Sequence, residues 1–113
     1  MKYSYNDVME QIGARGREML LAILNQAQDQ MKGAWFGQRK KLKNRLTAAK
    51  DKLLYGKDMD EGDLEIMTFG LEWIVTNFRM ALSQDNDSPE KTESLMNYID
   101  ELNEMKDKIE KMQ

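Results

Sequence analysis

Apolar residues recur at alternating steps of three and four along most of the chain. Two runs show the spacing most clearly: Leu64, Met67, Leu71, Ile74, Phe78 and Ala81, then Leu95, Tyr98, Leu102, Met105, Ile109 and Met112. Such spacing places the apolar side chains on one face of a helix and is not compatible with a strand. The pattern therefore predicts an all-α protein.

Capping and turn residues divide this pattern into four helices. Ser4 and Asp7 form a capping pair for the first helix, and Gly37 precedes the second. Acidic residues and two glycines in 56–63 precede the third, while Pro89 suits the first position of the fourth. The predicted helices span residues 5–34, 38–55, 61–82 and 89–112.

Short connections between helices of this spacing are typical of antiparallel neighbours. The sequence thus predicts one domain, residues 1–113, folded as an antiparallel four-helix bundle with coiled-coil-like packing. Gly13 and Gly16 weaken the first helix, which either kinks there or lets another helix approach its backbone closely. Its expected inward residues are Val8, Ile12, Met19, Ile23, Ala27, Met31 and Ala34.

The third helix is apolar nearly all round. Besides the stripe described above it carries a second one, formed by Ile66, Phe69, Trp73 and Met80. A helix in a small bundle normally keeps about half of its surface in water. Two interpretations follow: either the other helices wrap unusually far around this one, or the second stripe lies in a protein interface.

Charge is distributed unevenly along the chain. Residues 1–57 hold 12 basic and 5 acidic residues, a net charge of +7, whereas residues 58–113 hold 5 and 15, a net charge of −10. Three arrangements would satisfy this asymmetry. The halves face each other within one fold, two copies pair antiparallel, or one half meets an outside partner of opposite charge.

The basic charge concentrates on the second helix and the residues after it, 39–57. Two rows of cations flank its apolar line, and the candidate contact residues are Arg39, Lys41, Lys43, Arg45, Lys50 and Lys52. One interpretation pairs them with the acids of the fourth helix: Glu90, Glu93, Asp100, Glu101, Glu104, Asp107 and Glu110. The other makes them contacts for the phosphates of a nucleic acid.

The candidate chemistry is narrow because the chain has no Cys and no His. Thiolate nucleophiles, imidazole bases and the metal sites built from either are excluded. The remaining carboxylates follow the pattern of a solvated helix face, so we expect no enzyme activity, no metal and no cofactor. Among the 10 methionines, Met59, Met80 and Met96 are candidates for an exposed, adaptable patch.

No apolar run reaches the roughly 20 residues of a membrane span, and we expect a cytoplasmic protein that does not enter a membrane. The sequence predicts a non-enzymatic helical bundle that binds another protein as an adaptor, chaperone or inhibitor of a larger complex, and that forms a homodimer. Phages and mobile elements encode many small chains of this type. The alternative is a nucleic-acid-binding protein that uses the basic helix 39–57.

Overall fold

The computed structural model describes residues 2–31, 37–84 and 89–113. Its helices are α1 (Tyr5–Gln30), α2 (Gln38–Leu54), α3 (Glu61–Gln84) and α4 (Pro89–Met112), and its strands are β1 (Lys2–Tyr3) and β2 (Met59–Asp60). The predicted all-α class and four-helix architecture are confirmed. Helix α1 ends before residue 34, where the prediction placed its end, and α3 continues to Gln84; Ala34 lies outside the described residues.

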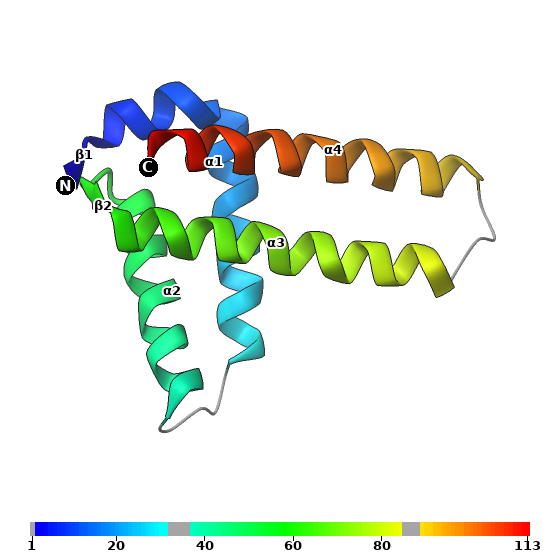
Figure 1. The fold of residues 1–113 in the computed structure, drawn as a ribbon, viewed down its shortest axis with the longest axis horizontal. Helices are drawn as coiled ribbons and strands as arrows, with labels where there is room; N and C mark the ends of the chain where they lie inside the picture. Colours follow the sequence, from blue (N-terminus) through cyan, green and yellow to red (C-terminus); the bar gives the residue numbers. More distant parts are fainter. Residues whose placement is uncertain (1, 32–36, 85–88) are drawn as a thin grey trace.

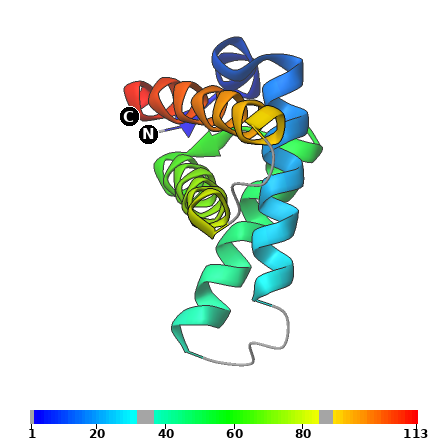
Figure 2. The same ribbon diagram turned by 90° about the vertical axis from the view of Figure 1, so that its right-hand side faces the viewer.

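The helices form two antiparallel hairpins packed as two layers (Figures 1 and 2). Helices α1 and α2 make one layer, and α3 and α4 cross over it steeply instead of running alongside it. Helix α3 contacts each of the other three helices, whereas α2 and α4 lie apart. Of the two interpretations of the third helix, wrapping by the other helices is therefore present, but only where the two layers overlap.

Local side chains fix the helix ends, as the sequence predicts. The hydroxyl of Ser4 accepts a hydrogen bond from the backbone N–H of Asp7 at 3.1 Å, and α4 begins at Pro89. At the other end of α2, the guanidinium of Arg17 donates to the carbonyls of Leu53 and Leu54 at 3.3 and 3.0 Å. These bonds satisfy carbonyls that a helix leaves without partners at its C-terminus.

A two-stranded sheet, which the sequence pattern does not predict, ties the N-terminus to the segment before α3. Strands β1 and β2 are antiparallel, with Lys2 opposite Asp60 and Tyr3 opposite Met59. Met59 is fully buried at this junction. Its expected place in an exposed methionine patch is wrong, because the strand pairing turns its side chain into the core.

The apolar stripes of the helices merge into a single core. The buried face of α1 differs from the predicted one: Leu20 and Leu24, which are not among the predicted inward residues, are fully buried, whereas Ile12 and Met19 are only half-buried. The reason is that α1 contacts all three other helices, so more than one stripe of its surface is covered.

The sequence leaves two alternatives for the glycines of α1, a kink or a close approach by another helix, and each glycine shows one of them. Gly13 has φ 71° and ψ 174°, so the helix kinks there. Gly16 is buried, and a Cβ built on it would lie 3.1 Å from the sulfur of Met105 on α4. The kink turns the first turns of α1 away from the rest of the helix, and the bare backbone lets α4 approach.

We expect Gly13→Ala to lower the free energy of unfolding by roughly 1–3 kcal/mol, because its φ and ψ lie in a region that residues with a Cβ seldom adopt. Urea denaturation followed by circular dichroism would measure this. Gly16→Ala tests the close packing separately: Gly16 has no positive φ, but its Cβ would lie 3.0 Å from the Cβ of Ile12 and 3.1 Å from the sulfur of Met105, so a loss there reports crowding and not the backbone conformation. A Gly13→Ala protein as stable as the parent would contradict the kink.

Candidate functional site

The structure separates the four residues predicted on the second stripe of α3. Ile66 is 3% exposed and belongs to the core. Phe69 and Trp73 are half-buried and pack against the edge of that core, while Met80 is 55% exposed. The chain itself therefore covers Ile66, and the other three remain accessible to a partner.

The side chain of Trp73 lies in the corner where α3 crosses α1. It lines an open pocket with Gln26, Asp29 and Gln30 of α1 and with Ile74 and Asn77 of α3. The walls contributed by α1 are polar, so the pocket offers hydrogen-bonding groups around one aromatic ring. The indole is only partly covered within a single chain.

The end of the α3–α4 hairpin extends beyond the α1–α2 layer (Figure 1). We call residues 76–84 and 89–98 the arm. None of these described residues is buried, although Val75 and Ile99, immediately inward, are. The seam of the arm is formed by half-buried side chains: Phe78, Leu82, Leu95 and Tyr98. They are less covered because no helix of the other layer reaches them.

The arm also carries two exposed methionines, Met80 on the second stripe of α3 and Met96 on α4. Met80 and Met96 are 55% and 54% exposed, and the rings of Phe78 and Tyr98 lie 5.7 Å apart across the seam. Partial burial raises the pKa of the Tyr98 hydroxyl, which stays protonated at neutral pH. The arm thus carries both flexible thioethers and two half-buried aromatic rings, side chains suited to contact with a second protein.

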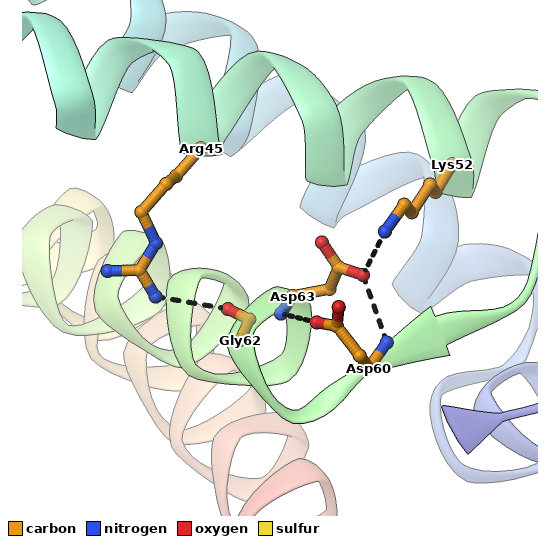
Figure 3. Close-up of polar contacts among 5 residues, drawn as sticks. All are labelled: Arg45, Lys52, Asp60, Gly62 and Asp63. Carbon is orange, nitrogen blue, oxygen red and sulfur yellow. Dashed lines mark hydrogen bonds and ion pairs between the residues drawn. The ribbon is translucent and has the colours of Figure 1, made fainter. Parts of the chain in front are cut away.

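Three of the six basic residues predicted on α2 bind within the chain, and Figure 3 shows two of them, Arg45 and Lys52. The ammonium of Lys52 contacts the carboxylate of Asp63 at 2.6 Å, and Arg45 donates to the carbonyl of Gly62 at 3.3 Å. Lys50 donates to the side-chain carbonyl of Gln28 at 2.8 Å. The hydrogen bond with Asp63 raises the pKa of Lys52. These three cations hold α2 against α3 and α1.

Asp63 and Asp60 also cap α3, a pairing that the sequence analysis did not identify. Each carboxylate accepts the backbone N–H of the other residue, at 2.9 and 3.0 Å (Figure 3). The N–H of Asp63 lowers the pKa of the Asp60 carboxyl. The signal was present as two acids three residues apart before an apolar run, the spacing of a reciprocal cap.

The other half of the basic helix is open to solvent. Arg39, Lys40 and Lys41 are exposed and Lys43 is half-buried, and none of them makes an ion pair with any residue in the described ranges. We call these four residues the basic end of α2. The predicted basic surface is thus divided between a structural half and an unpaired half.

The acids of α4 do not pair with α2. Glu101 binds Arg15 of α1 at 2.6 Å, and Lys106 binds Glu72 of α3 at 2.9 Å and Glu110 at 3.7 Å. The Arg15 hydrogen bond lowers the pKa of Glu101, and the bond to Glu72 raises the pKa of Lys106. Within the described part of the chain no ion pair joins α2 to α4, so the proposed pairing of these helices inside one bundle is wrong.

An outward row of acids remains on α4. Its members are exposed and make no ion pair with the residues that the structure places: Glu93, Asp100, Glu104 and Asp107. We call this row the acidic ridge; the exposed Lys111 ends it. Across residues 2–31, 37–84 and 89–113, no three acidic side chains are grouped closely enough to hold a metal ion.

Comparison with protein-family models, with curated proteins and with solved structures found no match to this chain. Among the described helices, none is long and apolar enough to cross a membrane. The class that the fold defines is a small all-α protein of two crossed helical hairpins with one projecting arm.

Proposed function

We propose that this chain is a non-enzymatic protein-binding module that acts as an adaptor, chaperone or inhibitor of a larger complex. The arm and the accessible part of the second stripe of α3 form its binding surface. The observation that carries the proposal is the half-covered seam of the arm, together with Met80 and Met96, which lie elsewhere on the arm at more than half exposure. A partner that covered this seam would remove apolar surface from water, which favours association.

The side chains available at this surface support a protein as the partner. Aromatic anchors carry much of the energy of protein interfaces, and three aromatic side chains are partly exposed, Trp73 at the crossing of α3 and α1 and Phe78 and Tyr98 on the arm. Methionines adapt to irregular partner surfaces. The partner is another protein or, in a homodimer, a second copy of this chain.

We expect Met80→Glu combined with Met96→Glu to reduce partner capture about ten-fold or more, because two carboxylates would have to lose water in an apolar contact. A photo-crosslinking residue at position 97, which is exposed next to Met96, would report capture in cells that express the chain. The unfolding free energy should change by no more than about 0.5 kcal/mol, since both side chains are exposed.

A crosslinker at the exposed position Ala48 of α2 is the matched control, because it lies far from the arm along the chain and on the other layer. The proposal requires adducts from position 97 that the paired Glu variant loses. Equal adduct yields from positions 97 and 48, or yields that the variant leaves unchanged, would show that the arm is not the binding surface.

Nucleic-acid binding through α2 is the second candidate, and the unpaired basic end is the observation that favours it. Only Arg39, Lys41 and Lys43 of the six predicted contacts are available, because Arg45, Lys50 and Lys52 already hold groups of this chain. A smaller set of cations neutralises fewer phosphates and so supports a weaker, salt-sensitive interaction.

A further inference from the structure

We propose that the basic end of α2 in one copy of this chain binds the acidic ridge of α4 in a second copy. The contact goes beyond the proposed function, because it is a self-association through charge that leaves the apolar seam of the arm free. It rests on two faces of opposite sign that the fold keeps apart within one molecule.

The internal ion pairs show why each face keeps an excess of one sign. The inward cations of α2 are satisfied by Asp63 of α3 and by the Gln28 amide of α1. The inward acid of α4, Glu101, is satisfied by Arg15 of α1, and Glu72 of α3 is satisfied by Lys106. What is left outside without a described ion pair is four cations on α2 and, on α4, Glu90 and the four acids of the ridge against Lys108 and Lys111, so folding leaves each face with an excess of one sign.

Because of the position of these cations on α2, a negative charge close to them would be stabilising. The four residues of the basic end lie in the first two turns of α2, and the first turn holds no acidic residue. The N-terminus of a helix carries the positive end of its dipole, so cations there are disfavoured and anions favoured. Gly37, the N-cap residue, provides no side-chain hydrogen bond. Carboxylates of a neighbouring molecule would offset both effects.

The acidic ridge has the size to supply those carboxylates. From Asp100 to Asp107 it extends for about 10 Å along α4, a distance that Lys and Arg side chains from either side of one helical turn can cover. Each copy contributes one basic end and one ridge, so the numbers match in a self-association. The net charge of −3 is small and does not oppose the approach of two copies.

The test is the mass of the full chain in solution, measured by analytical ultracentrifugation over a range of protein concentrations and of salt. We expect a mass above the monomer at about 0.01 M salt that returns to the monomer at about 1 M, because the Debye length shortens from about 30 Å to about 3 Å. A protein that is monomeric at low salt and at high protein concentration overturns the proposal.

Charge reversal identifies the faces. Lys40→Glu with Lys41→Glu, and separately Asp100→Lys with Glu104→Lys, should each give a monomer at low salt, and an equimolar mixture of the two variants should associate again. Glu10→Lys with Asp51→Lys makes the same change of net charge as Asp100→Lys with Glu104→Lys, at exposed positions outside both faces, and should leave the association intact. Equal loss in this control, or no recovery in the mixture, overturns the proposal.

Two further outcomes separate this contact from other uses of the same residues. Met80→Glu with Met96→Glu should leave the salt-sensitive association unchanged, so failure of the arm as a binding surface and failure of this contact are distinguishable. If the parent chain stays monomeric yet retards DNA or RNA, and Lys40→Glu with Lys41→Glu abolishes the retardation, the basic end serves nucleic acid and the self-association is wrong.

Discussion

Replacing Leu53 by Ala is expected to lower the free energy of unfolding by about 3 kcal/mol, within the roughly 2–5 kcal/mol typical of buried leucines. Leu53 has no exposed surface and belongs to the core that all four helices share. Removing three heavy atoms there loses their transfer energy and leaves a cavity that the crossed layers can only partly close. Urea denaturation followed by far-ultraviolet circular dichroism measures the change.

The neighbouring residue provides the matched control. Leu54 is 44% exposed, undergoes the same chemical change in Leu54→Ala, and shares the same helix end, where Arg17 binds the carbonyls of both residues. The expected cost is under about 1 kcal/mol, because much of its side chain is already in water. Comparable losses for the two variants would mean that α2 does not present this face to α1 and α3.

The helices themselves could be predicted because their signals are local. Ser4 with Asp7 and the position of Pro89 define helix starts within a few residues, and the 3–4 spacing of α3 and α4 defines their inward faces. The pairing of β1 with β2 joins residues more than fifty positions apart, and no periodicity in two residues announces it. The burial of Met59 follows from that pairing and could not be predicted without it.

The second stripe of α3 shows the limit of a pattern on one helix. Ile66 and Met80 lie on the same stripe, yet one is buried and the other is 55% exposed. The pattern reports how much apolar surface the helix carries, and the neighbouring elements determine which part of it is covered. Because the α1–α2 layer packs against the inner part of α3 and the end of the α3–α4 hairpin extends beyond it, the inner part of the stripe becomes core and the outer part becomes arm.

The basic helix shows the same limit for charge. Composition shows the excess of cations in residues 37–57. It does not show which of them have partners: Lys43 and Lys50 lie on the same side of the helix, yet only Lys50 has a described side-chain partner. The crossing of the layers brings α3 to the C-terminal half of α2 and leaves the N-terminal half uncovered. Which charged side chains have partners therefore depends on how the helices pack, and this cannot be derived from a single sequence.

Replacing Asp63 by Ala is expected to lower the free energy of unfolding by about 2 kcal/mol. Its carboxylate is 7% exposed and accepts two hydrogen bonds, from the ammonium of Lys52 at 2.6 Å and from the N–H of Asp60 at 3.0 Å. Loss of a helix cap costs roughly 0.5–2 kcal/mol, and a hydrogen bond to a charged group contributes about 1.5–3 kcal/mol. The two losses overlap because both bonds end on one oxygen.

A double-mutant cycle with Lys52→Met separates these contributions. Met keeps most of the stem of Lys52 and removes the ammonium, so the coupling between the two variants measures the ion pair alone. We expect a coupling of about 1 kcal/mol, since Lys52 is one-third exposed and water screens the pair. A coupling near zero, with Asp63→Ala still destabilising, would assign the whole effect to the cap.

The other half of the cap gives this junction a pH dependence of definite sign. The N–H of Asp63 holds the pKa of Asp60 below its ordinary value in the folded chain. A carboxyl whose pKa is lowered by folding stabilises the native state above the unfolded pKa, and this contribution is lost as the pH falls through the folded pKa. The unfolded value for Asp is about 3.9, so the loss should occur below about pH 4.

Asp60→Asn should weaken the fall in unfolding free energy over that range, measured by urea denaturation at successive pH values. Glu101→Gln removes the second carboxylate whose pKa folding lowers, and comparing the two variants separates the capping carboxylate from the one bound to Arg15. An unchanged acid profile in Asp60→Asn would show that the cap does not persist in solution.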